Sequence, residues 1–236
     1  MRNNLFFSTV SLLILVPSFV FAGGPQIKPL PPQPVTINGT DADDLIEIDL
    51  SGFARSPEGS PVSNIISTSM KIVVRINGVV AKTFSKTNMP PVISVFAKEG
   101  DDEIIFDADV SRFTTLRMDG DSGDDTIGSE QHINSTNPVC QSGATYVGMT
   151  IIGDFGDDNI YAGCGDDFVN GFAGNDVINV GGNGYDSVWG GPGDDDVIAW
   201  AGDDVDCGDD AGDILRYLAS AGSPPTYTDC ANIEPF

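Results

Sequence analysis

Aliphatic residues recur about every nine positions between Gly153 and Arg216, and glycine and aspartate dominate the residues between them. Each nine-residue unit ends in three residues whose central position is usually aliphatic, as expected of a short β-strand with one buried face. The six residues before this triplet are rich in residue types that favour turns. The pattern therefore predicts short strands that alternate with tight turns.

Seven units align in this segment, and Val180 is the one residue that interrupts their phase. The fourth position is glycine in every unit except the last, and the eighth is aliphatic in every unit except the sixth, where it is Asp206. The units are GDFGDDNIY (153–161), AGCGDDFVN (162–170), GFAGNDVIN (171–179), GGNGYDSVW (181–189), GGPGDDDVI (190–198), AWAGDDVDC (199–207) and GDDAGDILR (208–216). The sixth position is always aspartate: Asp158, Asp167, Asp176, Asp186, Asp195, Asp204 and Asp213.

This pattern resembles G-G-x-G-x-D-x-U-x, the calcium-binding repeat of the RTX family, which is known from bacterial haemolysins and metalloproteases. The resemblance implies an all-β fold, a parallel β-roll or β-helix solenoid in which two units complete one coil. Turns on the same side then recur about every eighteen residues. The sixth-position aspartates would form one column of Asp158, Asp176, Asp195 and Asp213 and a second of Asp167, Asp186 and Asp204.

The resemblance also implies calcium ions between successive turns of a column, roughly five in all. Calcium takes six to eight oxygen ligands at about 2.3–2.6 Å, so backbone carbonyls must supplement the sixth-position carboxylates. Glycine lets the backbone turn carbonyls inward and approach an ion closely. The expected glycine contributors are Gly153, Gly156, Gly171, Gly174, Gly181, Gly184, Gly190 and Gly193.

Charge supports a metal-dependent fold. The chain has 35 acidic and 11 basic residues, a formal net charge of -24, and residues 153–216 hold sixteen aspartates against one basic residue, Arg216. This sign excludes nucleic acid as a partner. Such close carboxylates repel one another, so the repeat segment is predicted to fold only when divalent cations are bound.

The N-terminus predicts export. Residues 1–22 have a basic start, an apolar run and a small-x-small site that ends at Ala22, as in a cleaved signal peptide. A proline-rich linker follows at 23–34, and no later segment is apolar enough to span a membrane. The protein is expected to be secreted, to a bacterial periplasm or the exterior. RTX toxins and proteases generally use an uncleaved C-terminal signal instead, so the final destination stays open.

Residues 35–128 are interpreted as degenerate rungs of the same solenoid. Three nonamers, 39–47, 97–105 and 120–128, place Asp44, Asp102 and Asp125 in sixth position. Each is an isolated turn without a same-side neighbour, so calcium ligation and a simple Asx turn are both open. Apolar runs on either side of Asn77-Gly78 predict a β-hairpin inserted in this half.

Residues 129–152 are expected to form an irregular excursion and a strand. The excursion contains His132, the single histidine, which excludes a zinc site with spaced histidines. Residues 217–236 are interpreted as a C-terminal cap over the open end of the roll. Four cysteines in an exported chain predict two disulfides with three possible pairings. Similar cysteine-containing endings in related secreted repeat proteins favour Cys207 with Cys230, which leaves Cys140 for Cys164.

No catalytic motif is present, so the protein is expected not to be an enzyme. One alternative is a calcium-dependent polysaccharide lyase of the parallel β-helix type, with Lys98, Arg112 or Arg117 as its base. Another is a surface adhesin whose partner is a cell-surface glycan or protein. Phe172, Trp189 and Trp200 are unusual aromatics for this repeat, and they would favour such a platform if they cluster on the surface.

Overall fold

Regular structure in the described part of the chain is almost entirely β, apart from two short 3-10 helices, η1 (Lys86–Asn88) and η2 (Ala108–Arg112). The computed structural model describes residues 32–51, 70–129, 140, 144–181, 184–208, 210–218 and 224–236. The predicted signal peptide, most of the predicted linker and His132 lie outside these ranges. Within these ranges, no helix has the length and apolar character to cross a membrane.

The strands form two sheets, which we call sheet A and sheet B. Sheet A contains, in spatial order, β1 (Val35–Asn38), β5 (Val92–Glu99), β7 (Thr115–Ser122), β9 (Thr150–Phe155), β11 (Phe168–Ala173), β13 (Ser187–Trp189), β15 (Asp204–Asp206) and β17 (Thr226–Thr228). Sheet B contains β4 (Val79–Ser85), β3 (Lys71–Ile76), β2 (Leu45–Ser51), β6 (Glu103–Phe106), β8 (Thr126–Ser129), β10 (Asn159–Tyr161), β12 (Val177–Asn179), β14 (Asp196–Ala199), β16 (Ile214–Tyr217) and β18 (Asn232–Pro235).

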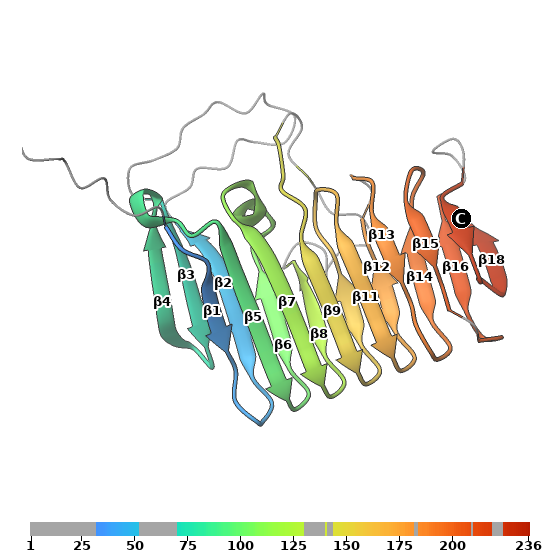
Figure 1. Cartoon of the computed structure of the whole chain (residues 1–236), viewed down its shortest axis with the longest axis horizontal. Coiled ribbons are helices and arrows are strands. Elements are labelled where there is room, and N and C mark those ends of the chain that lie inside the picture. The colour runs from blue at the N-terminus through green and yellow to red at the C-terminus, as the bar shows by residue number, and fades with distance from the viewer. Residues whose placement is uncertain are drawn as a thin grey trace, which may run out of the picture. The chain divides into compact units, whose positions relative to one another are not determined.

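The chain passes from one sheet to the other at almost every turn, and each strand pairs in parallel with the equivalent strand of the next coil. In sheet B, for example, Ile160 lies opposite Ile178, and Ile178 lies opposite Val197. Figure 1 shows these coils side by side in chain order, from blue β1 to red β18. The predicted all-β parallel solenoid is confirmed.

The core lies between the two sheets, because the middle residue of each short strand points inward. These residues form one row in each sheet, and nearly all are fully buried. The row of sheet A is Ile37, Val95, Met118, Ile151, Val169, Val188 and Val205. The row of sheet B is Ile46, Ile104, Ile127, Ile160, Ile178, Val197 and Leu215. Within residues 153–216 the eighth position of the nonamer supplies these rows, as the pattern predicts, except in the sixth unit, where Val205 takes the place of Asp206.

The predicted hairpin is present as β3 and β4. Asn77 and Gly78 form its turn, both with positive φ, and β3 pairs antiparallel with both β2 and β4. The hairpin thus extends sheet B beyond the first coil, and its Ile72, Val74 and Phe84 belong to the common core.

The C-terminal segment, which was predicted to be a cap, forms one more coil on the end of the roll, because β17 and β18 pair in parallel with β15 and β16. The residues that continue the two inward rows, Tyr227 and Ile233, remain 40% and 39% exposed. Both segments can form strands because the polarity of their residues alternates, as Thr-Tyr-Thr in β17 and Asn-Ile-Glu in β18.

Candidate metal centre

The turns that lead from sheet A to sheet B form one continuous column, which we call column 1. Its turns end at a buried aspartate in every coil that the structure describes between Asp44 and Asp213. Each aspartate is joined to the next by a hydrogen bond: the N–H of Asp125 donates to Oδ1 of Asp158 over 2.8 Å, and that of Asp158 to Asp176 over 2.9 Å. The members are Asp44, Asp102, Asp125, Asp158, Asp176, Asp195 and Asp213.

The second carboxylate oxygen of these residues has no partner in most of the column. Oδ2 is buried and accepts no hydrogen bond in Asp102, Asp125, Asp158, Asp176, Asp195 and Asp213. A buried carboxylate oxygen without a partner is costly, and native proteins seldom leave one. A regular series of them indicates a ligand that the protein atoms do not supply.

Backbone carbonyls approach the same position. A methyl group added to Gly153 would overlap Oδ2 of Asp158 and lie 2.7 Å from the carbonyl oxygen of Gly171 in the next coil. The same arrangement recurs at Gly171, where the added group would meet Asp176 and lie 2.7 Å from the carbonyl oxygen of Gly190. A carboxylate oxygen and a carbonyl oxygen of the next coil therefore face one small space, which glycine leaves open.

This donor set fits a hard cation such as calcium, which takes oxygen ligands from both carboxylates and carbonyls. Among the described residues, no three histidine, cysteine, aspartate or glutamate side chains converge on one point. A metal in column 1 would therefore need carbonyls in its shell, as the glycine-rich turns allow. Gly156 illustrates the turn geometry, since its φ of 138° is unfavourable for other residues and a Cβ there would overlap the carbonyl of Gly123.

Burial makes these carboxylates resist ionisation when no cation is bound. It raises the pKa of Asp158 to about 8, although a backbone hydrogen bond from Asp125 opposes the shift and the charges of Asp176 and Asp125 add to it. The same balance of burial, backbone hydrogen bonding and neighbouring charge raises the pKa of Asp125 and Asp195 to about 7. A cation between the turns would offset this unfavourable charge.

Residues 152–182 and 180–206 match the family model described as RTX calcium-binding nonapeptide repeat (4 copies). The chain carries RTX repeats. No curated protein and no solved structure matches it. The matched residues contain the aspartates of column 1 from Asp158 to Asp195, whose unpartnered oxygens were described above. The earlier part of the column lies outside the matched residues.

The first three aspartates of column 1 are not isolated turns, contrary to the expectation from sequence. Asp102 and Asp125 have the same hydrogen bonds and the same unpartnered Oδ2 as the RTX aspartates. Asp44 differs, because Oδ2 accepts from the N–H of Thr40 and Oδ1 from Nδ2 of Asn77. Burial would raise the pKa of Asp44, but these hydrogen bonds and nearby Lys98 lower it. Asp44 therefore resembles an ordinary turn residue.

The turns that lead from sheet B to sheet A form column 2, which consists of Asp167, Asp186 and Asp203. The placement of Asp204 in this column is wrong. Asp204 is exposed at the start of β15, whereas the N–H of Asp186 donates to Oδ1 of Asp203 over 3.0 Å. The reason is a shorter turn at 199–203, which moves β15 by one residue and brings Val205, not Asp206, into the core.

Column 2 is less regular than column 1. Its turns span 162–167, 180–186 and 199–203, so their lengths differ. Gly181 thereby shifts from the first to the second turn position, and its N–H donates to Oδ1 of Asn179. Oδ2 of Asp167 accepts a hydrogen bond from the N–H of Gly163, and Oδ2 of Asp203 accepts one from the N–H of Trp200. Of the three aspartates in column 2, only Asp186 has a buried Oδ2 without a partner. Column 2 is therefore the weaker metal candidate.

An exposed ladder at the fifth turn position was missed by the sequence analysis. Here the N–H of each residue donates to the side chain of its counterpart one coil earlier, as from Asp124 to Asp101 over 3.1 Å and from Asp157 to Asp124 over 3.0 Å. The recurring Asp-Asp pairs could have revealed it. The ladder comprises Asp43, Asp101, Asp124, Asp157, Asn175 and Asp194.

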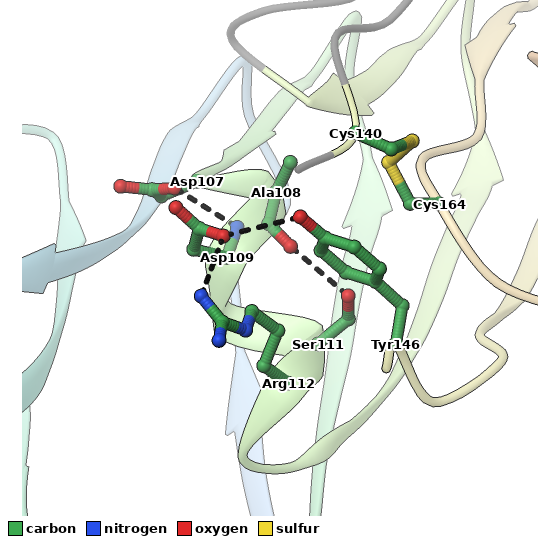
Figure 2. A network of polar contacts seen from close by, with 8 residues as sticks. All are labelled: Asp107, Ala108, Asp109, Ser111, Arg112, Cys140, Tyr146 and Cys164. Atoms are coloured by element: carbon green, nitrogen blue, oxygen red, sulfur yellow. Dashed lines mark hydrogen bonds and ion pairs between the residues drawn. A yellow bond between two sulfur atoms is a disulfide. The ribbon is translucent and has the colours of Figure 1, made fainter. Parts of the chain in front are cut away.

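The connection from β6 to β7 lies on the side of column 2, and a network of side chains takes the place of the column 2 turn aspartate there. Figure 2 shows Asp109 of η2 accepting a hydrogen bond from the hydroxyl of Tyr146 and forming an ion pair with Arg112. Beside it, Cys140 and Cys164 form a disulfide (Figure 2). This connection therefore carries its own internal cation, the guanidinium of Arg112.

Both disulfides have the predicted pairing, Cys140 with Cys164 and Cys207 with Cys230. The second attaches the turn after β15 to the turn before β18, and so fixes the last coil to the roll.

The candidate bases of the lyase alternative are spread over separate positions. Arg112 is engaged with Asp109, and Nζ of Lys98 contacts Asp41 over 3.2 Å. Arg117 lies on the outer side of β7, opposite Ser94 and Thr150. The three cations therefore lie on different elements and have different neighbours.

The three unusual aromatics do not form one group. Trp200 is 8% exposed and belongs to the core, whereas Trp189 and Phe172 are 40% and 42% exposed. Only the latter two can contribute to an aromatic surface.

Proposed function

We propose that the sixth-position carboxylates of column 1 hold calcium ions between successive coils, and that this binding drives the folding of the roll. The observation that carries the proposal is the series of buried Oδ2 atoms without partners. At Asp125, Asp158, Asp176 and Asp195 a backbone carbonyl of the next coil faces the same small space. Calcium would supply the positive charge that these oxygens lack. RTX repeats are calcium-binding repeats, which is in keeping with this role.

We place these sites in five intervals of column 1, between neighbouring members of the series that carries unpartnered oxygens. The series is Asp102, Asp125, Asp158, Asp176, Asp195 and Asp213. The proposal thus includes two aspartates that precede the RTX match. It leaves Asp44 out, because both of its carboxylate oxygens already have protein partners.

We also propose that the protein acts outside the cytoplasm and without catalysis. The apolar N-terminal segment with its small-x-small site supports export by a cleaved signal peptide. The two disulfides suit an oxidising compartment. Extracellular calcium modules generally have weak sites, with Kd values of roughly 10⁻⁴–10⁻³ M, which external calcium can fill.

The test is far-UV circular dichroism of the protein in chelator and during titration with calcium. We expect little β-structure in chelator and a cooperative gain in the millimolar range, with magnesium as the control ion that does not reproduce it. Magnesium requires a small octahedral shell and retains its water, so shared carbonyl sites suit it poorly. A spectrum that chelation leaves unchanged would contradict the proposal.

A further inference from the structure

An open pocket of about 440 Å³ lies where β13 and β15 of sheet A lead into the turns of column 1. Its lining residues are Trp189, Gly191, Pro192, Asp206, Gly208, Asp210 and Asp229. Its volume lies in the lower part of the range of roughly 300–1,000 Å³ that is typical of small-molecule sites.

Trp189 faces outward because the strand alternates. Its neighbour Val188 is buried in the core, so Trp189 points to the opposite side of β13. The fold does not require an aromatic residue here, since the equivalent positions of the other coils hold polar, acidic, aliphatic and aromatic side chains. These positions are Asn38, Phe96, Asp119, Ile152, Asn170, Asp206 and Thr228.

Phe168 holds the indole ring in place. Its ring lies on the neighbouring strand β11, with its centroid 4.7 Å from that of Trp189 and the two planes tilted by 46°. Such a pair contributes about 0.5–1.5 kcal/mol beyond its buried area. The ring of Trp189 is thus supported by Phe168 and also lines the pocket, where it offers a rigid apolar surface.

We propose that this pocket binds a neutral pyranose unit of a glycan. The apolar C–H face of a sugar ring can lie against the indole, and its hydroxyl groups can donate hydrogen bonds to Asp206, Asp210 and Asp229. Asp210 and Asp229 are exposed, so an ion pair with an amine would contribute little here, about 0–1 kcal/mol. An acidic sugar would be repelled by the three carboxylates and by the net charge of -24.

The test is calorimetric titration of the calcium-loaded protein with four hexasaccharides and with spermine. Three are neutral β-1,4-linked chains of glucose, mannose and N-acetylglucosamine, and the fourth is hexagalacturonate. We expect at least one neutral chain to bind with a Kd below 1 mM, and the uronate to bind at least tenfold more weakly. Failure of all three neutral chains, or tighter binding of the uronate or of spermine, would overturn the proposal.

Matched variants locate the site. We expect Trp189→Ala to weaken binding of the neutral chain at least tenfold and Asp206→Asn to weaken it severalfold. Tyr185→Ala is the control, since Tyr185 is 74% exposed on a column 2 turn and does not line the pocket. Unchanged binding by Trp189→Ala would refute the assignment.

The proposal rests on the calcium proposal only because the roll must be folded to present the pocket. Circular dichroism in calcium therefore accompanies each titration. Folding in calcium without any sugar binding would contradict only the pocket proposal. A circular dichroism spectrum that calcium does not change would contradict the calcium proposal.

Discussion

The sixth-position aspartates of column 1 have two different carboxylate oxygens. Oδ1 accepts the N–H of the preceding coil and so aligns the turns, as Asp176 does for Asp158 over 2.9 Å. In every member from Asp102 to Asp213, Oδ2 is buried without a partner. One oxygen therefore serves the backbone and the other is available to a cation. Asparagine at the same place can keep the first contact and replace the second oxygen with an amide NH₂, which repels a cation.

Asp176→Asn is therefore expected to reduce the number of bound calcium ions by at least one and to raise the calcium concentration at the folding midpoint severalfold. Asp204→Asn is the matched control, because it removes the same charge from an exposed side chain outside both columns. It should keep the wild-type stoichiometry. Isothermal calorimetry measures both. Equal effects of the two substitutions would mean that calcium is held by diffuse acidity and not by the column.

At the scale of single elements, the nine-residue pattern predicted the strands, the inward row and the column from Asp158 to Asp213, and Asn77-Gly78 predicted the hairpin. The nine-residue pattern misplaced β15 because two changes in length cancel each other. The turn at 199–203 is short, whereas the connection from Asp206 to Ile214 is one residue longer than the equivalent connection from Trp189 to Asp196. The overall period of eighteen residues is thereby preserved. Counting from sequence could not detect a shift that begins and ends within one coil.

The earlier members of column 1 were missed as a column for a related reason. Asp44 and Asp102 are 58 residues apart because the hairpin lies between them, and Asp125 and Asp158 are 33 apart because of the excursion. Insertions of this size hide a repeat in the sequence, but in space the turns remain adjacent.

The Cys207–Cys230 disulfide determines how firmly the last coil is attached. Both β17 and β18 are exposed along their whole length, so few apolar contacts hold them. Replacing both cysteines by serine should destabilise the calcium-loaded protein by up to about 3 kcal/mol, the value expected for closing a loop of this length.

The loss of stability should be confined mainly to the last coil. Hydrogen exchange of Thr226–Thr228 and Asn232–Pro235 should therefore become faster, while that of β9–β14 stays slow. Cys140→Ser with Cys164→Ser is the control pair, because that disulfide lies beside η2 and not beside the last coil. Uniformly faster exchange in both double variants would contradict a local role.

For the whole molecule, charge decides when the roll can fold. The net charge of -24 opposes compaction, and most of the column carboxylates have pKa values raised by burial, to about 8 for Asp158, 7 for Asp195 and 6 for Asp176. Protons and calcium therefore act on the same oxygens. Each calcium site saturated at ten times its Kd contributes about 1.4 kcal/mol to the stability of the folded state.

Acid should partly replace calcium. A carboxyl whose pKa is 3.8 when unfolded and about 6–8 when folded favours the folded state at low pH, and this contribution is lost as pH rises through the folded values. The chelated protein should therefore show more β-structure at pH 5 than at pH 8, and calcium should remove the difference. Circular dichroism measures this at pH 5, above the pI of about 4.1 where solubility is lowest. A chelated protein that gains β-structure as pH rises would contradict the argument.

The most direct measurement is an anomalous difference map from crystals of the calcium-loaded protein. We predict peaks along column 1, one between each neighbouring pair of turns from Asp102 to Asp213, including the two intervals on either side of Asp125, which precedes the RTX match. Each peak should have Oδ2 of the column aspartate among its ligands. Peaks confined to the exposed fifth-position ladder, or an empty column in the presence of millimolar calcium, would contradict the account.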